Sequence, residues 1–458
     1  MGVGGVGMSG VAEMMSGLGY EVSGSDLTAS AATERLRARG IELGLGHDPG
    51  RVAGADAVVV SAAVPDDDPE VAEARRRGLP VVPRGVMLAG LAASRSTVAV
   101  TGTHGKSTTS SMVAVMLAEC GLDPAVLVGA RVDAFGSNAR LGDGPHFVVE
   151  ADESEPSLLA LRPRVAVLTN LEPEHLDHYG TFDRLRDTLV RFANRTVESG
   201  AVVACGDDAG VAGLRDRIER RVVTYAMEDG SADVVGREAV CGADGSRCRV
   251  RFSRGGRPET AGLEIAVPGT HNLLNGLAAF AVGVELGLEP EAVGAGLRRF
   301  TGVGRRFEHR GTAAGVRVVD DYGHHPTEIA AVLATARRQP HGRLVVVFQP
   351  HRYSRTARFL DRFAAELAAA DVVVLVDIFP AGEAPLPGIT SERLARALRR
   401  ETDRPVHHVR GLDEVAPLVA GLARPGDLVL TLGAGPVGGV GGRLLEAIGT
   451  AAGRSGEA

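Results

Sequence analysis

Short runs of β-branched apolar residues alternate with alanine- and leucine-rich stretches along most of the chain. The runs have the length of buried strands, and the stretches between them have the composition of helices. This alternation is typical of α/β units built on parallel sheets, so we expect an α/β fold. No internal repeat with a period of roughly 20–50 residues is visible.

The apolar runs fall into three blocks, and we expect domains at 1–94, 95–303 and 304–458. A length of 458 residues agrees with this number, because one domain takes roughly 150 residues. We expect the small, polar tail at 451–458 to be frayed. The expected strands are 58–61 and 80–82, then 98–100, 147–149, 165–169 and 201–204, then 316–319, 344–348, 372–376 and 428–432.

Composition limits the partners of the protein. The net charge is −7 and no basic tract stands out, which argues against nucleic acid as a main partner. Tryptophan is absent and aromatic residues make up 4%, so stacking platforms for bases are scarce. No apolar run approaches the roughly 18–20 residues of a membrane span, and no signal peptide is visible. We therefore expect a soluble, cytoplasmic protein without a membrane span.

The cysteines agree with a reducing compartment. None of them forms a Cys-x-x-Cys pair, and none has histidines at zinc-finger spacing. We interpret them as buried or incidental thiols rather than as disulfides. They are Cys120, Cys205, Cys241 and Cys248.

Among the 50 Lys and Arg residues, Lys106 is the only lysine. A compact ammonium on a flexible stem reaches nucleotide phosphates, whereas the wide planar fork of arginine is a poor substitute there. The alternative is chance survival of one lysine in an arginine-biased sequence. Because Lys106 lies in the one Gly-Lys-Ser of the chain, the phosphate site is the favoured interpretation.

The segment around Lys106 has the features of a shortened phosphate-binding loop. The first glycine of the standard Gly-x-x-x-x-Gly-Lys-Ser pattern is missing, and Gly102-x-x-Gly105-Lys106-Ser107 remains. A β-branched strand precedes the loop and an amphipathic helix, 107–119, follows it, so backbone N–H groups at the helix start would bind phosphates. Lys106 would contact the β- and γ-phosphates, and the Ser107 hydroxyl would bind Mg²⁺. The alternative is a glycine-rich turn without a ligand.

Polar residues follow two strands of the second block, where α/β folds place their sites. Glu150 comes directly after the strand at 147–149, and a carboxylate is a ligand that Mg²⁺ prefers. His175 follows the strand at 165–169 among acidic residues and a second histidine. It can be a metal ligand or part of a solvated turn, and the residues alone favour the turn.

Five motifs carry a family resemblance. They are Gly-Val-Gly-Gly-Val-Gly-Met-Ser-Gly at 2–10, Gly-Thr-His-Gly-Lys-Ser at 102–107, Glu-Ala-Asp-Glu-Ser at 150–154, His-Asn-Leu-Leu-Asn at 271–275 and Asp-Asp-Tyr-Gly-His-His-Pro-Thr-Glu at 320–328. Together they resemble the Mur ligases, the ATP-dependent amide-forming enzymes of peptidoglycan assembly. Gln-Pro-His-Arg-Tyr-Ser-Arg-Thr at 349–356 resembles the branch that adds L-alanine. The matches run from residue 2 to about 435, nearly the whole chain. With this resemblance, a metal ligand becomes the favoured interpretation of His175.

The resemblance implies three α/β domains: a Rossmann-like domain for the UDP-sugar, a P-loop ATPase-like domain and a C-terminal Rossmann-like domain that closes over both. It implies ATP and Mg²⁺ as cofactors, with UDP-N-acetylmuramate and L-alanine as substrates of peptidoglycan precursor synthesis. In the implied reaction, the lactyl carboxylate attacks the γ-phosphate of ATP and forms an acyl phosphate. The amine of L-alanine then attacks that carbonyl and releases phosphate. We expect a monomer or a weak homodimer.

The resemblance also implies roles for residues around ATP. Lys106, Ser107 and Mg²⁺ would neutralise the phosphates, because phosphoryl transfer is mostly positioning and charge neutralisation. The metal would be held by Ser107, Glu150 and His175, while Arg306 and Asp321 would complete the ATP site on domain closure. The expected catalytic residues are thus Lys106, Glu150, His175, Arg306 and Asp321. The residues expected to bind ATP are Gly102, Thr103, His104, Gly105, Lys106, Ser107, Thr108, Asn272 and Asn275.

Two further sites are implied for the substrates. The glycine loop of the first block would bind the UDP pyrophosphate, with a turn that binds no nucleotide as the alternative. Arg352 and Arg355 would bind the carboxylate of the amino acid, because an arginine fork suits a carboxylate. Without the motif at 349–356, these two arginines would be interpreted as part of a solvated helix start. The expected substrate-binding residues are Gly4, Gly5, Gly7, Ser9, Asp26, Ser61, Ser154, Tyr322, His324, His325, Arg352 and Arg355.

The chain departs from the family pattern at its start. A glycine loop of this kind normally follows a buried central strand, but here it begins at residue 2. We expect a gap in the sheet of 1–94 beside the loop, which exposes apolar side chains and unpaired backbone groups. The expected cause is a misassigned start or a truncation, and a real truncation would put UDP-sugar binding in doubt.

A second departure concerns metal binding. Several Mur ligases hold a second metal with a carbamylated lysine, and Lys106 is already assigned to the phosphates. Any second Mg²⁺ must therefore use His175, carboxylates, waters and substrate oxygens.

Three other functions stay open. A sister ligase of the family attaches a tripeptide to the same sugar nucleotide, but the motifs at 150–154 and 349–356 favour the alanine branch. An NAD-dependent oxidoreductase would use the Gly-x-Gly-Gly-x-Gly loop with Asp26 as its ribose-binding acid, which leaves the lysine loop without a role. A nucleotide-binding protein without catalysis is favoured only by the missing strand.

Overall fold

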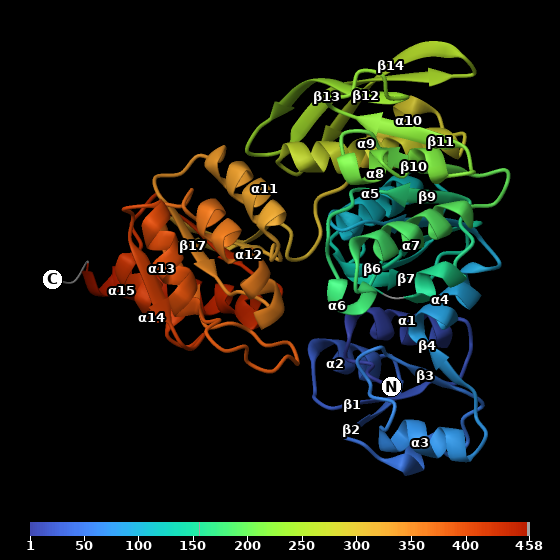
Figure 1. The fold of residues 1–458 in the computed structure, drawn as a ribbon, viewed down its shortest axis with the longest axis horizontal. Helices are drawn as coiled ribbons and strands as arrows, with labels where there is room; N and C mark the ends of the chain where they lie inside the picture. Colours follow the sequence, from blue (N-terminus) through green and yellow to red (C-terminus); the bar gives the residue numbers. More distant parts are fainter. Residues whose placement is uncertain (155, 456–458) are drawn as a thin grey trace. The chain divides into compact units, whose positions relative to one another are not determined.

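The computed structural model describes residues 1–154 and 156–455 and confirms the α/β fold class. The chain forms two compact units. The first consists of 1–240, 246–267 and 271–303, and the second of the chain from Gly304 onward with the short segments 241–245 and 268–270. Figure 1 shows the elements coloured along the sequence. The boundary expected at 94/95 stays a prediction.

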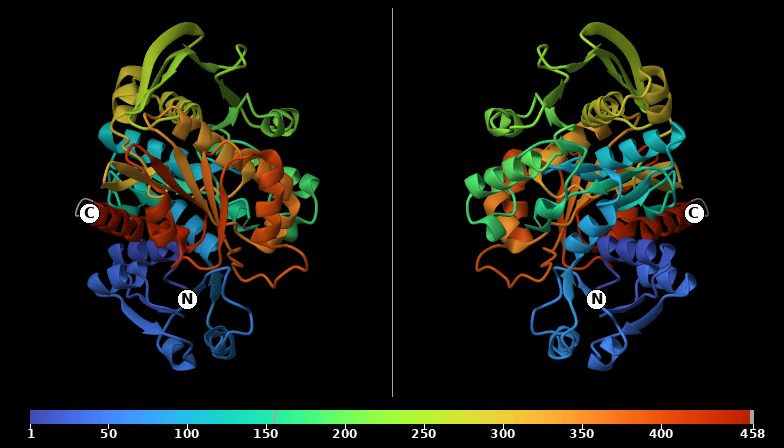
Figure 2. Two further views of the ribbon diagram at one scale, coloured as in Figure 1. Left: turned by 90° about the vertical axis from the view of Figure 1, so that its left-hand side faces the viewer. Right: turned by 90° about the vertical axis from the view of Figure 1, so that its right-hand side faces the viewer.

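A ten-stranded sheet forms the centre of the first unit, with strand order β14-β13-β12-β11-β10-β9-β5-β8-β6-β7. The four strands expected in this block are confirmed as β5, β8, β9 and β10, which are parallel neighbours in the sheet. Figure 2 shows β13 and β14 as a long hairpin at its edge, which the sequence analysis did not predict. The strands are β5 (Ser96–Thr101), β6 (Ala125–Val132), β7 (Ser137–Arg140), β8 (His146–Glu150), β9 (Val165–Leu168), β10 (Ala201–Cys205), β11 (Val222–Ala226), β12 (Val234–Cys241), β13 (Ser246–Arg254) and β14 (Arg257–Ile265).

Helix α5 (Lys106–Glu119) begins directly after the expected phosphate loop. It was expected to be amphipathic, but it is buried on every side from Ser107 to Leu117, because it packs against both the sheet and α10. The other helices that accompany this sheet are η2 (Pro156–Ala160), α6 (Leu176–Tyr179), α7 (Phe182–Asn194), α8 (Ala209–Ala212), η3 (Arg215–Arg217), α9 (Thr270–Glu285) and α10 (Pro290–Arg298).

The N-terminal part of the first unit contains two separate two-stranded parallel sheets, β1–β2 and β3–β4. The strands expected at 58–61 and 80–82 are confirmed as β3 and β4. Ser30 is the N-cap residue of α2, and its side chain accepts a hydrogen bond from the Thr33 N–H in a capping box. The elements are α1 (Val6–Gly17), β1 (Ser23–Asp26), α2 (Ala31–Ala38), β2 (Glu42–Leu45), η1 (Pro49–Val52), β3 (Val58–Val60), α3 (Pro69–Arg76), β4 (Val81–Pro83) and α4 (Arg84–Ala92).

The predicted gap beside the glycine loop is present. Among the described residues, no strand joins the β1–β2 sheet to the β3–β4 sheet. In both views of Figure 2 the amino terminus lies between the two strand pairs. The N–H groups of Gly2 and Val3 donate to Ser25 O at 2.8 and 3.1 Å, and the Met1 ammonium donates to Val59 O at 2.7 Å. The expected exposure of apolar side chains is wrong at Val3, which is 3% exposed, and the expected unpaired backbone groups are wrong for the N–H groups of Gly2 and Val3.

Helix α1 joins this part to the large sheet. Its residues Val11 and Met14 belong to the same hydrophobic core as Leu127 and Ala139 of β6 and β7. Gly10 faces these strands so closely that a Cβ atom there would overlap Leu127 Cδ1. The helix that follows the glycine loop is therefore fixed on the domain that carries the lysine loop.

The second unit is a six-stranded sheet of order β15-β16-β20-β17-β18-β19, mostly parallel, with helices on both faces. The four strands expected here are confirmed as β16, β17, β18 and β20. Alternate residues of β17 enter two separate cores, with Val346 in one and Val345 in the other. The elements are β15 (Glu308–Ala313), β16 (Val316–Asp321), α11 (Pro326–Arg337), β17 (Leu344–Phe348), α12 (Tyr353–Leu367), β18 (Val372–Val376), α13 (Ser391–Glu401), β19 (Val406–Val409), α14 (Val415–Leu422), β20 (Leu428–Leu432), η4 (Pro436–Val440) and α15 (Gly441–Ser455).

Two expectations about the chain as a whole can be compared with these elements. The expected fraying is wrong for 451–455, which continue α15, whereas 456–458 lie outside the described residues. Within the described part of the chain, no helix is both long enough and apolar enough to cross a membrane.

Gly10→Ala tests the docking of α1. Leu127 is 3% exposed and has little room to move away from a new methyl group, so we expect a loss of about 1–3 kcal/mol in stability. Gly90→Ala is the matched control, because Gly90 lies in α4 with nothing within 4 Å of an added Cβ. That change should be neutral or stabilising by up to about 1 kcal/mol. Thermal unfolding measures both, and equal effects of the two changes would contradict the docking.

Candidate functional site

The loop between β5 and α5 is built around two glycines in conformations that other residues rarely adopt. Gly102 has φ +129° and Gly105 has φ +80°. A Cβ at Gly102 would overlap Thr169 Oγ1, and one at Gly105 would lie 2.7 Å from Asn275 Oδ1. The His104 N–H donates to Asn170 Oδ1 at 2.7 Å, which fixes the loop against the end of β9.

Lys106 is held by this loop and by one buried carboxylate. Its Nζ donates to Gly102 O at 2.6 Å and to Thr103 O at 3.2 Å, and it lies 2.7 Å from Glu153 Oε2. The side chains of Lys106 and Glu153 are 14% and 1% exposed. Burial lowers the pKa of Lys106, but the negative charges of Glu153, Asp152 and Glu150 outweigh burial and raise the pKa to about 12. Lys106 is therefore a permanent cation at the start of α5.

Glu150 and Ser107, two of the expected metal ligands, lie together. Glu150 ends β8, and its Oε2 accepts a hydrogen bond from the Gly129 N–H at 2.6 Å. Burial raises the pKa of Glu150, while the charge of Lys106 and hydrogen bonds from Gly129 and Ser107 act in the opposite direction. Carboxylate and hydroxyl oxygens are hard ligands, so this pair fits a magnesium ion.

His175, the third expected metal ligand, lies beside a different glutamate. Its Nε2 is 3.3 Å from Glu153 Oε1, and its backbone has the left-handed φ of 54°. His175, Asp152 and Glu153 each offer one ligand atom, and these atoms lie within 4.8 Å of one another. Ser154, an expected substrate residue, instead donates through its N–H and hydroxyl to Asp152 Oδ1 at 2.9 and 2.8 Å.

The sequence analysis missed Asp152 and Glu153 as site residues. Both stand in the Glu-Ala-Asp-Glu-Ser motif directly after a buried strand, and this position was the available signal. Burial raises the pKa of Asp152, but the Lys106 charge and the two hydrogen bonds from Ser154 outweigh burial and lower it. The motif thus contributes three acidic side chains, not one, around Lys106.

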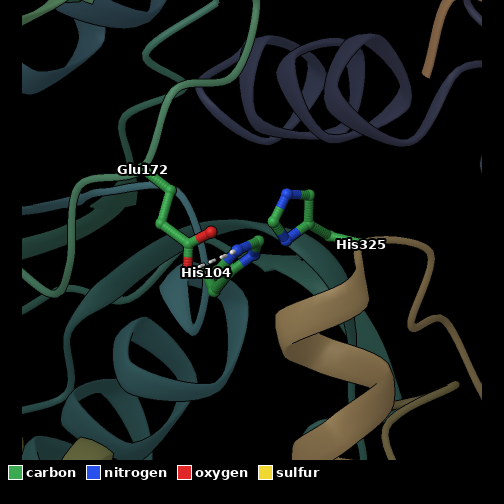
Figure 3. A group of neighbouring side chains, drawn as sticks. All are labelled: His104, Glu172 and His325. Atoms are coloured by element: carbon green, nitrogen blue, oxygen red, sulfur yellow. Dashed lines mark ion pairs between the residues drawn. The ribbon is translucent and has the colours of Figure 1, made fainter. Parts of the chain in front are cut away.

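Other residues expected to bind ATP surround the same loop. His104 Nε2 and Glu172 Oε1 are 3.9 Å apart, as drawn in Figure 3. Thr103 Oγ1 accepts a hydrogen bond from the Glu172 N–H at 2.9 Å, and Thr108 is buried in the first turn of α5. Asn272 and Asn275 lie on α9 and are 8% and 9% exposed. The contact of Asn275 with Gly105 brings α9 to the loop.

The N-terminal glycine loop is held from within the protein. Asp26 Oδ2 accepts a hydrogen bond from the Gly4 N–H at 2.7 Å, so this expected substrate-binding residue supports the loop. A Cβ at Gly7 would overlap the guanidinium of Arg84, a neighbour that the sequence analysis missed. The remaining expected residues of this site make local hydrogen bonds. The Gly5 N–H donates to Gly2 O, the Ser9 hydroxyl donates to Val6 O, and Ser61 Oγ accepts from the Ala63 N–H.

In the second unit, Asp321 ends β16 and is 3% exposed. Its oxygens accept hydrogen bonds from the N–H groups of Phe307 and Gly323, both at 2.7 Å. Burial raises the pKa of Asp321 to about 6, with the charge of Arg306 and these hydrogen bonds acting against it. Arg306 lies 3.4 Å from Glu328 and 5.2 Å from the centre of the Tyr322 ring. The expected catalytic pair of this unit therefore stands beside an expected substrate residue.

His324 joins the same group. Its Nδ1 lies 3.3 Å from Glu328 Oε2, and its ring centre is 5.8 Å from that of His351. Burial lowers the pKa of His324 to about 3, so its ring is neutral at physiological pH. Arg355 Nη1 is 3.2 Å from His351 Nδ1, which brings one of the two expected arginines towards this histidine.

Two of the expected substrate residues have structural contacts. His325, also drawn in Figure 3, is 1% exposed and caps α11 by accepting the Thr327 N–H at 3.4 Å. Its ring packs edge-on against Phe359 with centres 4.7 Å apart. Arg352 has the left-handed φ of 69° at the start of α12 and lies 4.0 Å from Glu383. Its guanidinium is held near an acid that the sequence analysis did not name.

The chain is similar to known proteins over nearly its whole length. Three family models match the chain: "Mur ligase family, catalytic domain" at 1–96, "Mur ligase middle domain" at 100–283 and "Mur ligase, glutamate ligase domain" at 305–435. The UDP-N-acetylmuramate–L-alanine ligase of Nitratidesulfovibrio vulgaris is 47% identical over 446 residues, which are 97% of this chain and 97% of that protein.

Two solved structures are similar over the same length. The UDP-N-acetylmuramate-alanine ligase of Thermotoga maritima has a TM-score of 0.82 at 29% identity and covers 97% of both chains. A murein peptide ligase of Psychrobacter arcticus has a TM-score of 0.73 at 24% identity and covers 98% of both, which shows a shared fold. On these family models and identities, the chain belongs to the Mur ligase family.

Proposed function

We propose that the protein is an ATP-dependent ligase that joins L-alanine to the lactyl carboxylate of UDP-N-acetylmuramate in peptidoglycan precursor synthesis. The observation that carries the proposal is the 47% identity, over 97% of the chain, to a UDP-N-acetylmuramate–L-alanine ligase. The charged loop at Lys106 supports it, because ATP-driven ligation needs a cationic phosphate site. A cytoplasmic location and a monomer or weak homodimer belong to the proposal.

The proposed reaction has two steps. A lactyl carboxylate oxygen attacks the γ-phosphorus of ATP, the bond to the bridging oxygen breaks, and ADP leaves. The amine of L-alanine then attacks the carbonyl carbon of the acyl phosphate, loses a proton, and expels phosphate as the amide forms. Such a sequence requires that the carboxylate and the γ-phosphate are held in line while their negative charges are neutralised.

The lysine loop supplies the chemistry for the first step. Backbone N–H groups at the start of α5 would bind the phosphates, and the permanent charge of Lys106 would neutralise them. Mg²⁺ fits Ser107 and Glu150 and, when bound, supplies further positive charge to the phosphates. The neighbouring Asn275 is proposed to contact the adenosine part of the nucleotide, as is Asn272.

The amino acid is proposed to bind in the second unit. Because His324 is neutral, the arginines Arg352 and Arg355 would provide the positive charge for its carboxylate. Tyr322 and His324 would line the same place. Arg306 and Asp321 stay the proposed catalytic residues of this unit.

Substrate dependence tests the function. Phosphate release from ATP should require UDP-N-acetylmuramate and L-alanine together, because the amine completes the reaction. Release is measured with purified protein as each component is left out in turn. Activity with a tripeptide in place of L-alanine would instead assign the chain to the murein peptide ligases.

Lys106→Arg tests the lysine loop. The planar guanidinium cannot take the place of the compact ammonium among two loop carbonyls and Glu153, so we expect kcat to fall by about 100-fold or more. Arg75→Lys, which changes an exposed ion pair with Asp66, is the control and should leave kcat unchanged. Equal kcat values for Lys106→Arg and the unaltered protein would remove Lys106 from the phosphate site.

Asp321 should make stability depend on pH. Its pKa is raised in the folded protein, so its stabilising effect is complete below about pH 4 and is lost as the pH rises to about 6. We expect the stability of the unaltered protein, relative to that of Asp321→Asn, to fall by about 2–3 kcal/mol as the pH rises over this range. Thermal unfolding across the range measures it, and a difference that is constant with pH would contradict the raised pKa.

A further inference from the structure

The ammonium group of Lys106 has no donor to spare for a phosphate. A lysine carries three N–H donors. Two of them point to the carbonyls of Gly102 and Thr103, and the third meets Glu153, whose two oxygens lie 2.9 and 2.7 Å from Nζ. A nucleotide phosphate can therefore bind Lys106 only if the lysine gives up a present partner.

Of the three partners of Lys106, Glu153 is the one most affected if the lysine leaves. Its side chain is 1% exposed, so its charge receives little help from water. A buried carboxylate that loses its cation is strongly destabilised unless a proton or another cation takes that place. When Lys106 turns to a phosphate, Glu153 therefore has to gain a proton or a new cation.

The surroundings of Glu153 are suited to a divalent cation. His175 Nε2 lies 3.3 Å from Glu153 Oε1, and Asp152 brings a second carboxylate. Ligand atoms of the three residues lie within 4.8 Å of one another. Mn²⁺ readily binds a set of carboxylate oxygens with one imidazole nitrogen. Mg²⁺ binds chiefly to the carboxylate oxygens of such a set.

We propose that Glu153 exchanges partners during nucleotide binding. It holds Lys106 while the phosphate site contains no nucleotide, and it binds a divalent cation with Asp152 and His175 once Lys106 has turned to the phosphates. The proposal rests on the proposed function only in that Lys106 binds nucleotide phosphates. It adds that Lys106 and the cation exclude each other at one carboxylate.

The exchange couples the two binding events. If the cation can enter only after Lys106 has left Glu153, then nucleotide strengthens cation binding at this place. By thermodynamic linkage the cation strengthens nucleotide binding by the same factor. Glu153 is thus a positioning residue for Lys106 and a ligand for the cation, but not for both at once.

Mn²⁺ binding without nucleotide tests the exclusion, with electron paramagnetic resonance of free Mn²⁺ as the readout. Lys106→Gln removes the competing charge, so the full-length variant should bind one Mn²⁺ at least about tenfold tighter than the unaltered protein. Lys106→Gln with Glu153→Gln should lose this gain. Lys106→Gln with Glu285→Gln is the matched control and should keep it, because Glu285 pairs with Arg221. Unchanged Mn²⁺ affinity in Lys106→Gln would overturn the proposal.

Nucleotide binding gives a second measurement that does not depend on the lysine variant. Affinity for a fluorescent ATP analogue is measured with and without Mg²⁺, and the ratio should fall about three- to tenfold in Glu153→Gln. An unchanged ratio would overturn the exchange. Neither measurement uses UDP-N-acetylmuramate or L-alanine, so failure of the proposed ligase reaction would appear separately, as missing phosphate release.

Discussion

The junction between β5 and α5 is the constraint on which the candidate site depends. β5 lies between β8 and β9 in the large sheet, and α5 is buried on every side, so neither element can shift without disturbing a core. The loop that joins them is further fixed by bonds to Asn170 and by two glycines without room for a side chain. Binding must therefore be accommodated by side chains, and Lys106 is the side chain placed to move.

Strand positions could be predicted from the sequence because their signal is local. The runs that became β5, β17 and β20 are short, β-branched and continuous, as buried parallel strands are. The surroundings of α5 could not be predicted in this way. The helix was expected to be amphipathic, but Ser110 bonds back to Lys106 O within the helix and α10 packs against it. The sequence pattern of one helix does not show which of its faces a helix distant in the sequence will cover.

The candidate site shows the same division between residues. Glu150 was named because it follows a strand and Ser107 because it belongs to the Gly-Lys-Ser loop, and the two side chains lie together. Glu153 lies three residues further on and was missed, since a sequence does not show which of several acids in a motif is buried. His325 was grouped with the substrate residues through its motif, yet its ring caps α11 and packs on Phe359. Asp26 supports the Gly4 backbone, a contact between residues far apart in the sequence.

The composition and the geometry around Lys106 explain each other. Arginine serves the ion pairs at the surface of this chain, such as Arg75 with Asp66, where its fork and long stem have room. At the start of α5 the cation must fit among the carbonyls of Gly102 and Thr103 and a carboxylate that is 1% exposed. It must also be able to leave Glu153 for another anion, which a compact ammonium with rotatable donors does more easily than a planar group bound at two points. A chain that uses arginine everywhere else therefore keeps its one lysine at the place where a cation has to exchange partners.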